Sequence, residues 1–68
     1  MTKAKRYCFY INLLAEDMTV VDSTYDHRYI KGSNDDEVYH RAIEYFDACL
    51  PLGSARYFEI EKWLEAAE

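Results

Sequence analysis

The stretch 31–46, KGSNDDEVYHRAIEYF, decides the fold, because it holds the clearest helix signal in a chain that is otherwise rich in extended segments. Asn34 followed three residues later by Glu37 matches a capping box, and acidic side chains at such a start complement the helix dipole. Apolar residues then recur at helical spacing until Pro51, which cannot continue a helix. We therefore expect one amphipathic helix, ended with the help of Gly53.

Two long extended segments precede this helix. Residues 6–15 carry apolar side chains on both alternating sets, which is typical of a central strand covered on both faces. Residues 18–30 alternate more regularly, and the set that runs from Val20 to Ile30 carries most of the charge and is expected to face water. A short polar break between the two segments predicts a β-hairpin.

A third strand is expected after the helix, over residues 55–64. Its side chains alternate, with Phe58 and Ile60 on one side and Tyr57 and Trp63 on the other. As a helix, the same segment would scatter its apolar residues around the whole circumference, so a strand is favoured and a helix remains the alternative.

Together these segments predict a small α+β domain over residues 1–68. The chain order is ββαβ, with a three-stranded antiparallel sheet of strand order 2-1-3 and one helix packed on one face. Residues 1–5 are expected to form a basic N-terminal arm, and residues 65–68 a tail that frays.

The charge balance restricts the partners. Thirteen acids against eight bases give a formal charge of −5. Such a body repels phosphate backbones and anionic lipid, which argues against direct nucleic-acid or membrane binding and favours a protein partner with a basic surface, such as a nucleic-acid-binding complex. Cys8 and Cys49 lack the spacing of a disulfide framework, so we expect two reduced, buried thiols and a cytoplasmic protein.

Residue types that carry catalysis or bind metals are scattered singly. His27, His40, Cys8 and Cys49 form none of the close pairs of zinc sites, and the two glycines make no phosphate-binding loop. We therefore predict no catalytic residue, no metal and no cofactor.

Acidic residues are the stronger signal, against the alternative that they only make the surface soluble. On a rigid scaffold, carboxylates can take the positions of phosphates in a basic groove, as in a DNA mimic. The acidic candidates for partner binding are Asp22, Asp26, Asp35, Asp36, Glu37, Glu44, Asp47, Glu59 and Glu61.

Aromatic residues give a second signal, because one helix covers only one face of a three-stranded sheet. Large side chains on the other face are expected in an interface with another protein or with a second copy. The aromatic candidates are Tyr10, Tyr25, Tyr29, Tyr57 and Trp63.

In size, charge and ββαβ plan the chain resembles small inhibitors encoded by phages and other mobile elements, including anti-CRISPR proteins. The resemblance covers the whole chain loosely and carries over no residue. It implies a non-enzymatic inhibitor that binds and blocks a host machine. The alternatives are a homodimeric accessory or regulatory module and a small subunit that completes another enzyme.

Overall fold

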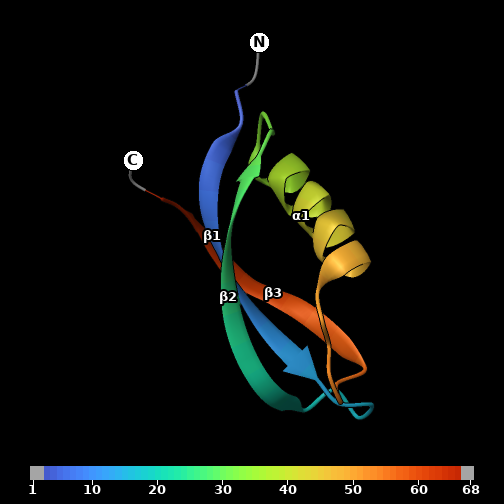
Figure 1. Cartoon of the computed structure of the whole chain (residues 1–68). Coiled ribbons are helices and arrows are strands. Elements are labelled where there is room, and N and C mark those ends of the chain that lie inside the picture. Colours follow the sequence, from blue (N-terminus) through green and yellow to red (C-terminus); the bar gives the residue numbers. More distant parts are fainter. Residues whose placement is uncertain (1–2, 67–68) are drawn as a thin grey trace.

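The computed structural model describes residues 3–66, and within them the chain forms three strands and one helix. The elements in chain order are β1 (Lys5–Leu14), β2 (Val20–Ile30), α1 (Asp35–Cys49) and β3 (Tyr57–Glu65). The strands form an antiparallel sheet of order β2-β1-β3, and α1 lies along one side of it (Figure 1). The predicted α+β class, the ββαβ order and the sheet order are confirmed.

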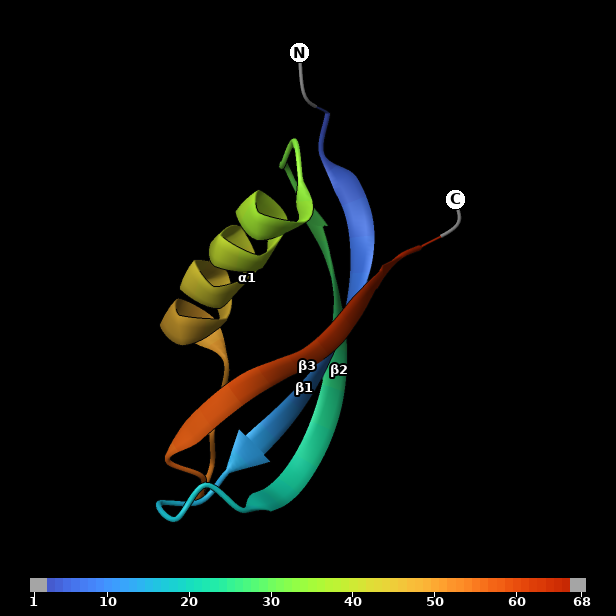
Figure 2. The ribbon, with the colours of Figure 1, turned by 180° about the vertical axis from the view of Figure 1, so that it is seen from behind.

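The hydrophobic core lies between the sheet and α1. Its buried members are Phe9, Ile11, Leu13, Ile30, Val38, Ala42, Phe46, Ala55 and Ile60. Alternate residues of β1 meet one stripe of the helix, and the Phe9 and Phe46 rings pack edge to face with centroids 5.5 Å apart. After α1, the chain runs to the hairpin end of the sheet before β3 begins (Figures 1 and 2). Within residues 3–66, no helix lies on the opposite side of the sheet.

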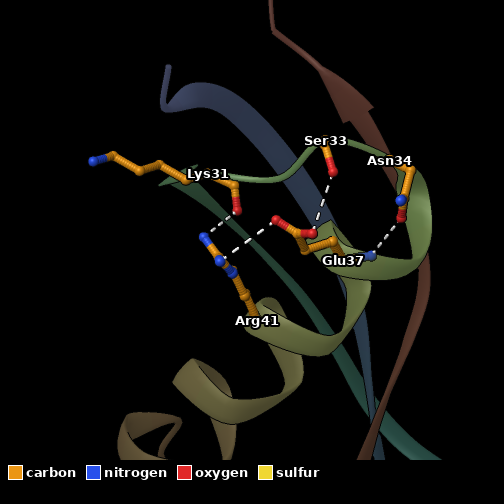
Figure 3. A network of polar contacts seen from close by, with 5 residues as sticks. All are labelled: Lys31, Ser33, Asn34, Glu37 and Arg41. Atoms are coloured by element: carbon orange, nitrogen blue, oxygen red, sulfur yellow. Dashed lines mark hydrogen bonds and ion pairs between the residues drawn. The ribbon is translucent and has the colours of Figure 1, made fainter. Parts of the chain in front are cut away.

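The start of α1 confirms the predicted cap in part. The Asn34 side chain accepts a hydrogen bond from the Glu37 N–H at 2.9 Å (Figure 3). The Glu37 carboxylate does not complete the box, and instead accepts from Ser33 Oγ at 3.3 Å and pairs with Arg41 at 3.4 Å. Arg41 also donates to the Lys31 carbonyl at 2.7 Å, which ties the helix to the end of β2.

We predict that Asn34→Ala lowers the free energy of unfolding by about 1 kcal/mol, because a helix N–H loses its acceptor. Urea denaturation measures the loss. Ser33→Ala is the matched control, since its hydroxyl contacts only the exposed Glu37 carboxylate. A loss as large for Ser33→Ala would contradict the assignment of Asn34 as the cap.

The end of α1 depends on Pro51 as expected, but Gly53 has another role. Leu50 caps the helix in an extended conformation, which the following proline favours, and its N–H donates to the Phe46 carbonyl at 2.8 Å. Gly53 has a φ of 62° and lies in the next turn, before β3. The prediction that Gly53 helps to end the helix is therefore wrong.

The hairpin turn is longer than the sequence suggests, because β2 begins at Val20 and not at Met18. Met18 has a φ of 71°, and its N–H donates to the Ala15 carbonyl at 2.8 Å. Asp17 accepts from the hydroxyl of Thr19 at 2.7 Å and from its N–H at 3.1 Å. The hydroxyl and then the N–H hold the pKa of Asp17 below its ordinary value.

We predict that Met18→Gly raises the free energy of unfolding by about 0.5–1 kcal/mol. The left-handed conformation costs a side-chain-bearing residue about 1–2 kcal/mol, and the greater entropy that glycine loses on folding offsets part of the gain. Met18→Ala keeps the strain and should give no gain. Thermal melting of the two variants compares them, and equal shifts would show that φ is not the cause.

The side of β2 that packs toward the helix differs from the prediction. Asp26 lies opposite Phe9, and Thr24 lies opposite Ile11. Because directly opposite residues share a face, the charged set lies on the helix side, and its last member, Ile30, is buried in the core. Most of the set is nevertheless exposed. Alternation in the sequence divides the side chains of a strand between two faces, but it does not show which face the helix covers.

A β-bulge in β3 overturns the predicted alternation there. Phe9 pairs with Trp63, but Ile11 pairs with Ile60, so the register shifts by one residue near Glu61. Ile60 and Trp63 consequently lie on the same, helix-facing side, and Trp63 is half-buried with its ring 6.4 Å from that of Phe9. The expectation that Ile60 and Trp63 lie on opposite sides of the strand is wrong.

Parts of the predicted arm 1–5 and tail 65–68 lie outside the described residues. Lys5 is already the first residue of β1. The N–H of Ala66 donates to the Arg6 carbonyl at 2.8 Å, so the described part of the tail continues the pairing with β1.

Candidate functional site

The acidic candidates divide between the two sides of the sheet. The helix side carries seven of them: Asp22, Asp26, Asp35, Asp36, Glu37, Glu44 and Asp47. Glu59 and Glu61 lie on the other side, where both contact Asn12. The sequence suggested one broad surface, and the structure gives one large and one small group of acids.

The five acids of α1 form the acidic helix surface: Asp35, Asp36, Glu37, Glu44 and Asp47. None of them is buried, because the stripe that faces the core is taken by apolar side chains. Arg41 is the one arginine among the helix residues, so the charge of α1 is 1 − 5 = −4 with histidine neutral.

Two further acids extend this group along β2. Asp22 is exposed near the hairpin end of the strand. Asp26 pairs with Arg28 at 3.3 Å, and the Arg28 guanidinium lies 4.7 Å from the centre of the Tyr45 ring on α1. The charge of Asp26 is thus partly neutralised by Arg28, which also contacts the helix. The charge of Asp22 faces water.

The side of the sheet without the helix is called the open face. Its members are Arg6, Cys8, Tyr10, Asn12 and Leu14 of β1, Val20, Ser23, Tyr25, His27 and Tyr29 of β2, and Tyr57, Glu59, Glu61, Lys62 and Leu64 of β3. The Tyr10 and Tyr25 ring centroids are 6.3 Å apart, and the Lys62 ammonium lies 5.0 Å from the centre of the Tyr10 ring. The middle of the open face is therefore aromatic and carries a cation.

A polar network crosses all three strands beside these rings. Ser23 Oγ donates to Asn12 Oδ1 at 2.9 Å, and Asn12 Nδ2 donates to Glu59 at 3.0 Å and to Glu61 at 3.3 Å. The sequence did not single out Asn12 or Lys62. Their importance follows from the cross-strand register and the bulge, which the pattern of a single strand does not give.

Four of the five aromatic candidates lie on the open face. Tyr25, Tyr29 and Tyr57 expose 64%, 63% and 49% of their surface, and Tyr10 is half-buried. Trp63 lies on the helix side, with its ring 5.6 Å from that of Tyr39. The binding role of all five stays a prediction.

The two cysteines are free thiols, but the expectation that both are buried is wrong. Cys8 is half-buried on the open face, opposite His27. The electrostatic effect of Cys8 is the main cause that raises the pKa of Tyr10 above its ordinary value. Cys49 is exposed at the end of α1, where its thiol donates to the Tyr45 carbonyl at 3.1 Å.

An open recess of about 570 Å³ lies between the start of α1 and β3. Tyr7, Asn34 and Trp63 are among its lining residues. Across residues 3–66, no three His, Cys, Asp or Glu side chains are grouped so as to hold a metal ion. Within residues 3–66, α1 is not long and apolar enough to cross a membrane.

Comparison of the chain with protein-family models, with curated proteins and with solved structures finds no match. The features of the molecule that bear on its function are therefore its two surfaces, the acidic helix side and the open face.

Proposed function

We propose that this protein is a cytoplasmic, non-enzymatic inhibitor that binds the basic, nucleic-acid-binding surface of another protein. The observation that carries the proposal is the acidic helix surface, with Asp22 and Asp26 on the same side. Inhibitors of this kind are encoded by phages and other mobile elements, and include the anti-CRISPR proteins.

The number of acids along the helix supports mimicry of one nucleic-acid strand. From Asp35 to Asp47 the helix rises about 18 Å, at about 1.5 Å per residue, and carries five carboxylates. One strand of B-DNA carries about five phosphates over the same length, at about 3.4 Å per phosphate. The match is to one strand, because a duplex would carry about twice that charge.

The partners of the acids within the protein indicate which of them are available. Glu37 is paired with Arg41, and Asp26 is paired with Arg28. Within residues 3–66 no ion pair is found for the five other acids on the helix side: Asp22, Asp35, Asp36, Glu44 and Asp47. We assign the main contacts to these five, because a basic partner need not first displace an internal cation.

The experiment starts with an affinity pull-down from host lysate, which supplies the partner, and then measures affinity. Glu44→Lys with Asp47→Lys should weaken binding by about tenfold or more, because both charges are reversed where they meet a basic surface. Glu59→Lys with Glu61→Lys is the matched control, with the same change of charge on the open face. Thermal melting should show both variants folded.

Two further readouts test mimicry directly. Binding of the unaltered protein should weaken as salt rises, since charge pairs are screened beyond about 8–10 Å at physiological ionic strength. Single-stranded or duplex DNA should compete with the protein for the captured partner. If helix-side reversal, salt and DNA all leave the affinity unchanged, the acids only make the protein soluble and the proposal is wrong.

The open face favours a second candidate, a homodimeric accessory or regulatory module. One sheet face of the described residues is uncovered and carries exposed tyrosines. Such a face is common where two subunits meet.

A further inference from the structure

The open face differs in charge from the rest of the protein. It carries two bases, Arg6 and Lys62, and two acids, Glu59 and Glu61, so its net charge is zero with histidine neutral. The remaining residues hold six bases and eleven acids, which gives the whole formal charge of −5. Two copies repel each other through any other side, whereas the open face can approach its own copy without that cost.

The charges of the open face are separated along the strands. Arg6 lies near one end of β1, and Lys62 is placed opposite Tyr10. Glu59 lies further along, opposite Asn12, and Glu61 reaches the same asparagine. Lys62 is thus in the middle of the face, two residues along from Glu59, whereas Arg6 is about 20 Å from Asn12 at about 3.3 Å per residue.

We propose that a second copy of this chain docks on the open face. The two sheets stack face to face about a twofold axis that runs across the strands, so the strands of the two copies run in opposite directions. With the axis at the level of Ile11, this arrangement sets Lys62 of each copy over Glu59 and Glu61 of its partner, which makes the contact self-complementary. Tyr10 lies beside Lys62, and together with Tyr25 it supplies the aromatic centre of the interface.

The small size of the face favours a dimer of low affinity. Three strands about 4.8 Å apart and about nine residues long make a face of about 14 by 30 Å. Stable interfaces bury about 800 Å² per partner, and this flat area is about half of that. We therefore expect a reversible dimer with a dissociation constant in the micromolar range, roughly 1–100 µM.

The primary experiment is sedimentation equilibrium of the unaltered protein from roughly 1 µM to roughly 500 µM. A shift from monomer to dimer within this range is expected. A protein that stays monomeric throughout overturns the proposal.

Charge exchange then tests the arrangement of the two copies. One variant, Arg6→Glu with Lys62→Glu, makes the open face wholly negative, and another, Glu59→Lys with Glu61→Lys, makes it wholly positive. Each alone should self-associate about tenfold or more weakly than the parent, and an equal mixture should restore the dimer. Glu44→Lys with Asp47→Lys is the control on the helix side, and should dimerise at least as well as the parent. Variants that dimerise like the parent, or a mixture that stays monomeric, overturn the proposal.

The native thiols give a test that needs no substitution. Cys8 lies on the open face and Cys49 on the helix, so maleimide labelling followed by peptide mass spectrometry reports both sides in one sample. Labelling of Cys8 should slow as the protein concentration rises, while labelling of Cys49 stays constant. Parallel slowing of both thiols, or of neither, contradicts a dimer through the open face.

This inference is independent of the proposed inhibition, because it uses the opposite side of the sheet. Loss of partner affinity with an intact dimer, or loss of the dimer with intact affinity at concentrations below self-association, separates the two proposals.

Discussion

Phe46→Ala should lower the free energy of unfolding by about 3–5 kcal/mol. Phe46 exposes only 1% of its surface, and its ring lies 5.5 Å from that of Phe9 and 6.5 Å from that of Phe58. Truncation removes the contact between α1 and two strands at once. The total stability of a domain of this length is about 3–10 kcal/mol, so much of the variant should be unfolded at room temperature.

Two milder variants make this result interpretable. Phe46→Leu keeps most of the volume and should cost less than about 1.5 kcal/mol, within the range of a denaturation experiment. Glu44→Ala changes an exposed residue of the same helix and should shift stability by about 0.5 kcal/mol or less. Circular dichroism during urea titration compares the three. If Phe46→Ala and Glu44→Ala shift the midpoint equally, α1 does not pack as described.

Gly32→Ala should lower the free energy of unfolding by about 1–3 kcal/mol, although it adds only one methyl group. A Cβ at Gly32 would lie 2.7 Å from Cγ2 of Val38 and 3.0 Å from its backbone nitrogen. Val38 is buried in the first turn of α1 and cannot move away without disturbing the core. The close approach explains why a glycine joins β2 to the helix here.

A double-mutant cycle isolates this contact. In a Val38→Ala background the methyl group that Gly32→Ala meets is gone, so the second substitution should cost less than it does in the parent. Gly53→Ala is the control, because no atom lies within 4 Å of its Cβ position and its cost comes from a φ of 62°. That cost should be the same in both backgrounds. If the changes in the free energy of unfolding caused by Gly32→Ala and Val38→Ala were strictly additive, the steric explanation would be contradicted.

The sequence was sufficient for the helix, for its cap at Asn34 and for the order of the strands. These features depend on local signals or on general rules of connection, which a single chain displays. Local signals do not show which side chains of the outer strands, β2 and β3, face the helix. The assignment of Asp26 to the helix side depends on its register against Phe9, and the position of Trp63 depends on one extra residue at the bulge.

The candidate surfaces show the same division. Glu37, Glu44 and Asp47 could be placed on the polar side of α1 from helical periodicity alone. The open face could be expected to exist, but the meeting of Asn12 with Glu59, which are 47 residues apart, follows only from strand pairing. The burial of Cys8 and Cys49 was predicted because cysteine is usually a buried residue type. Both are more exposed than that, because they lie outside the core between the sheet and α1.

The first and last strands lie side by side, so the chain is suited to circular permutation. Lys5 and Glu65 lie side by side, with 3.7 Å between the ammonium and the carboxylate, because β1 pairs with β3. A linker of about four to six small residues could join them, with the chain reopened in the turn at Gly53. In this circular permutant the strands follow one another as β3, β1 and β2, and the helix comes last. Every pairing of the sheet then joins neighbours in sequence, so the permutant should fold faster than the parent while keeping the same sheet.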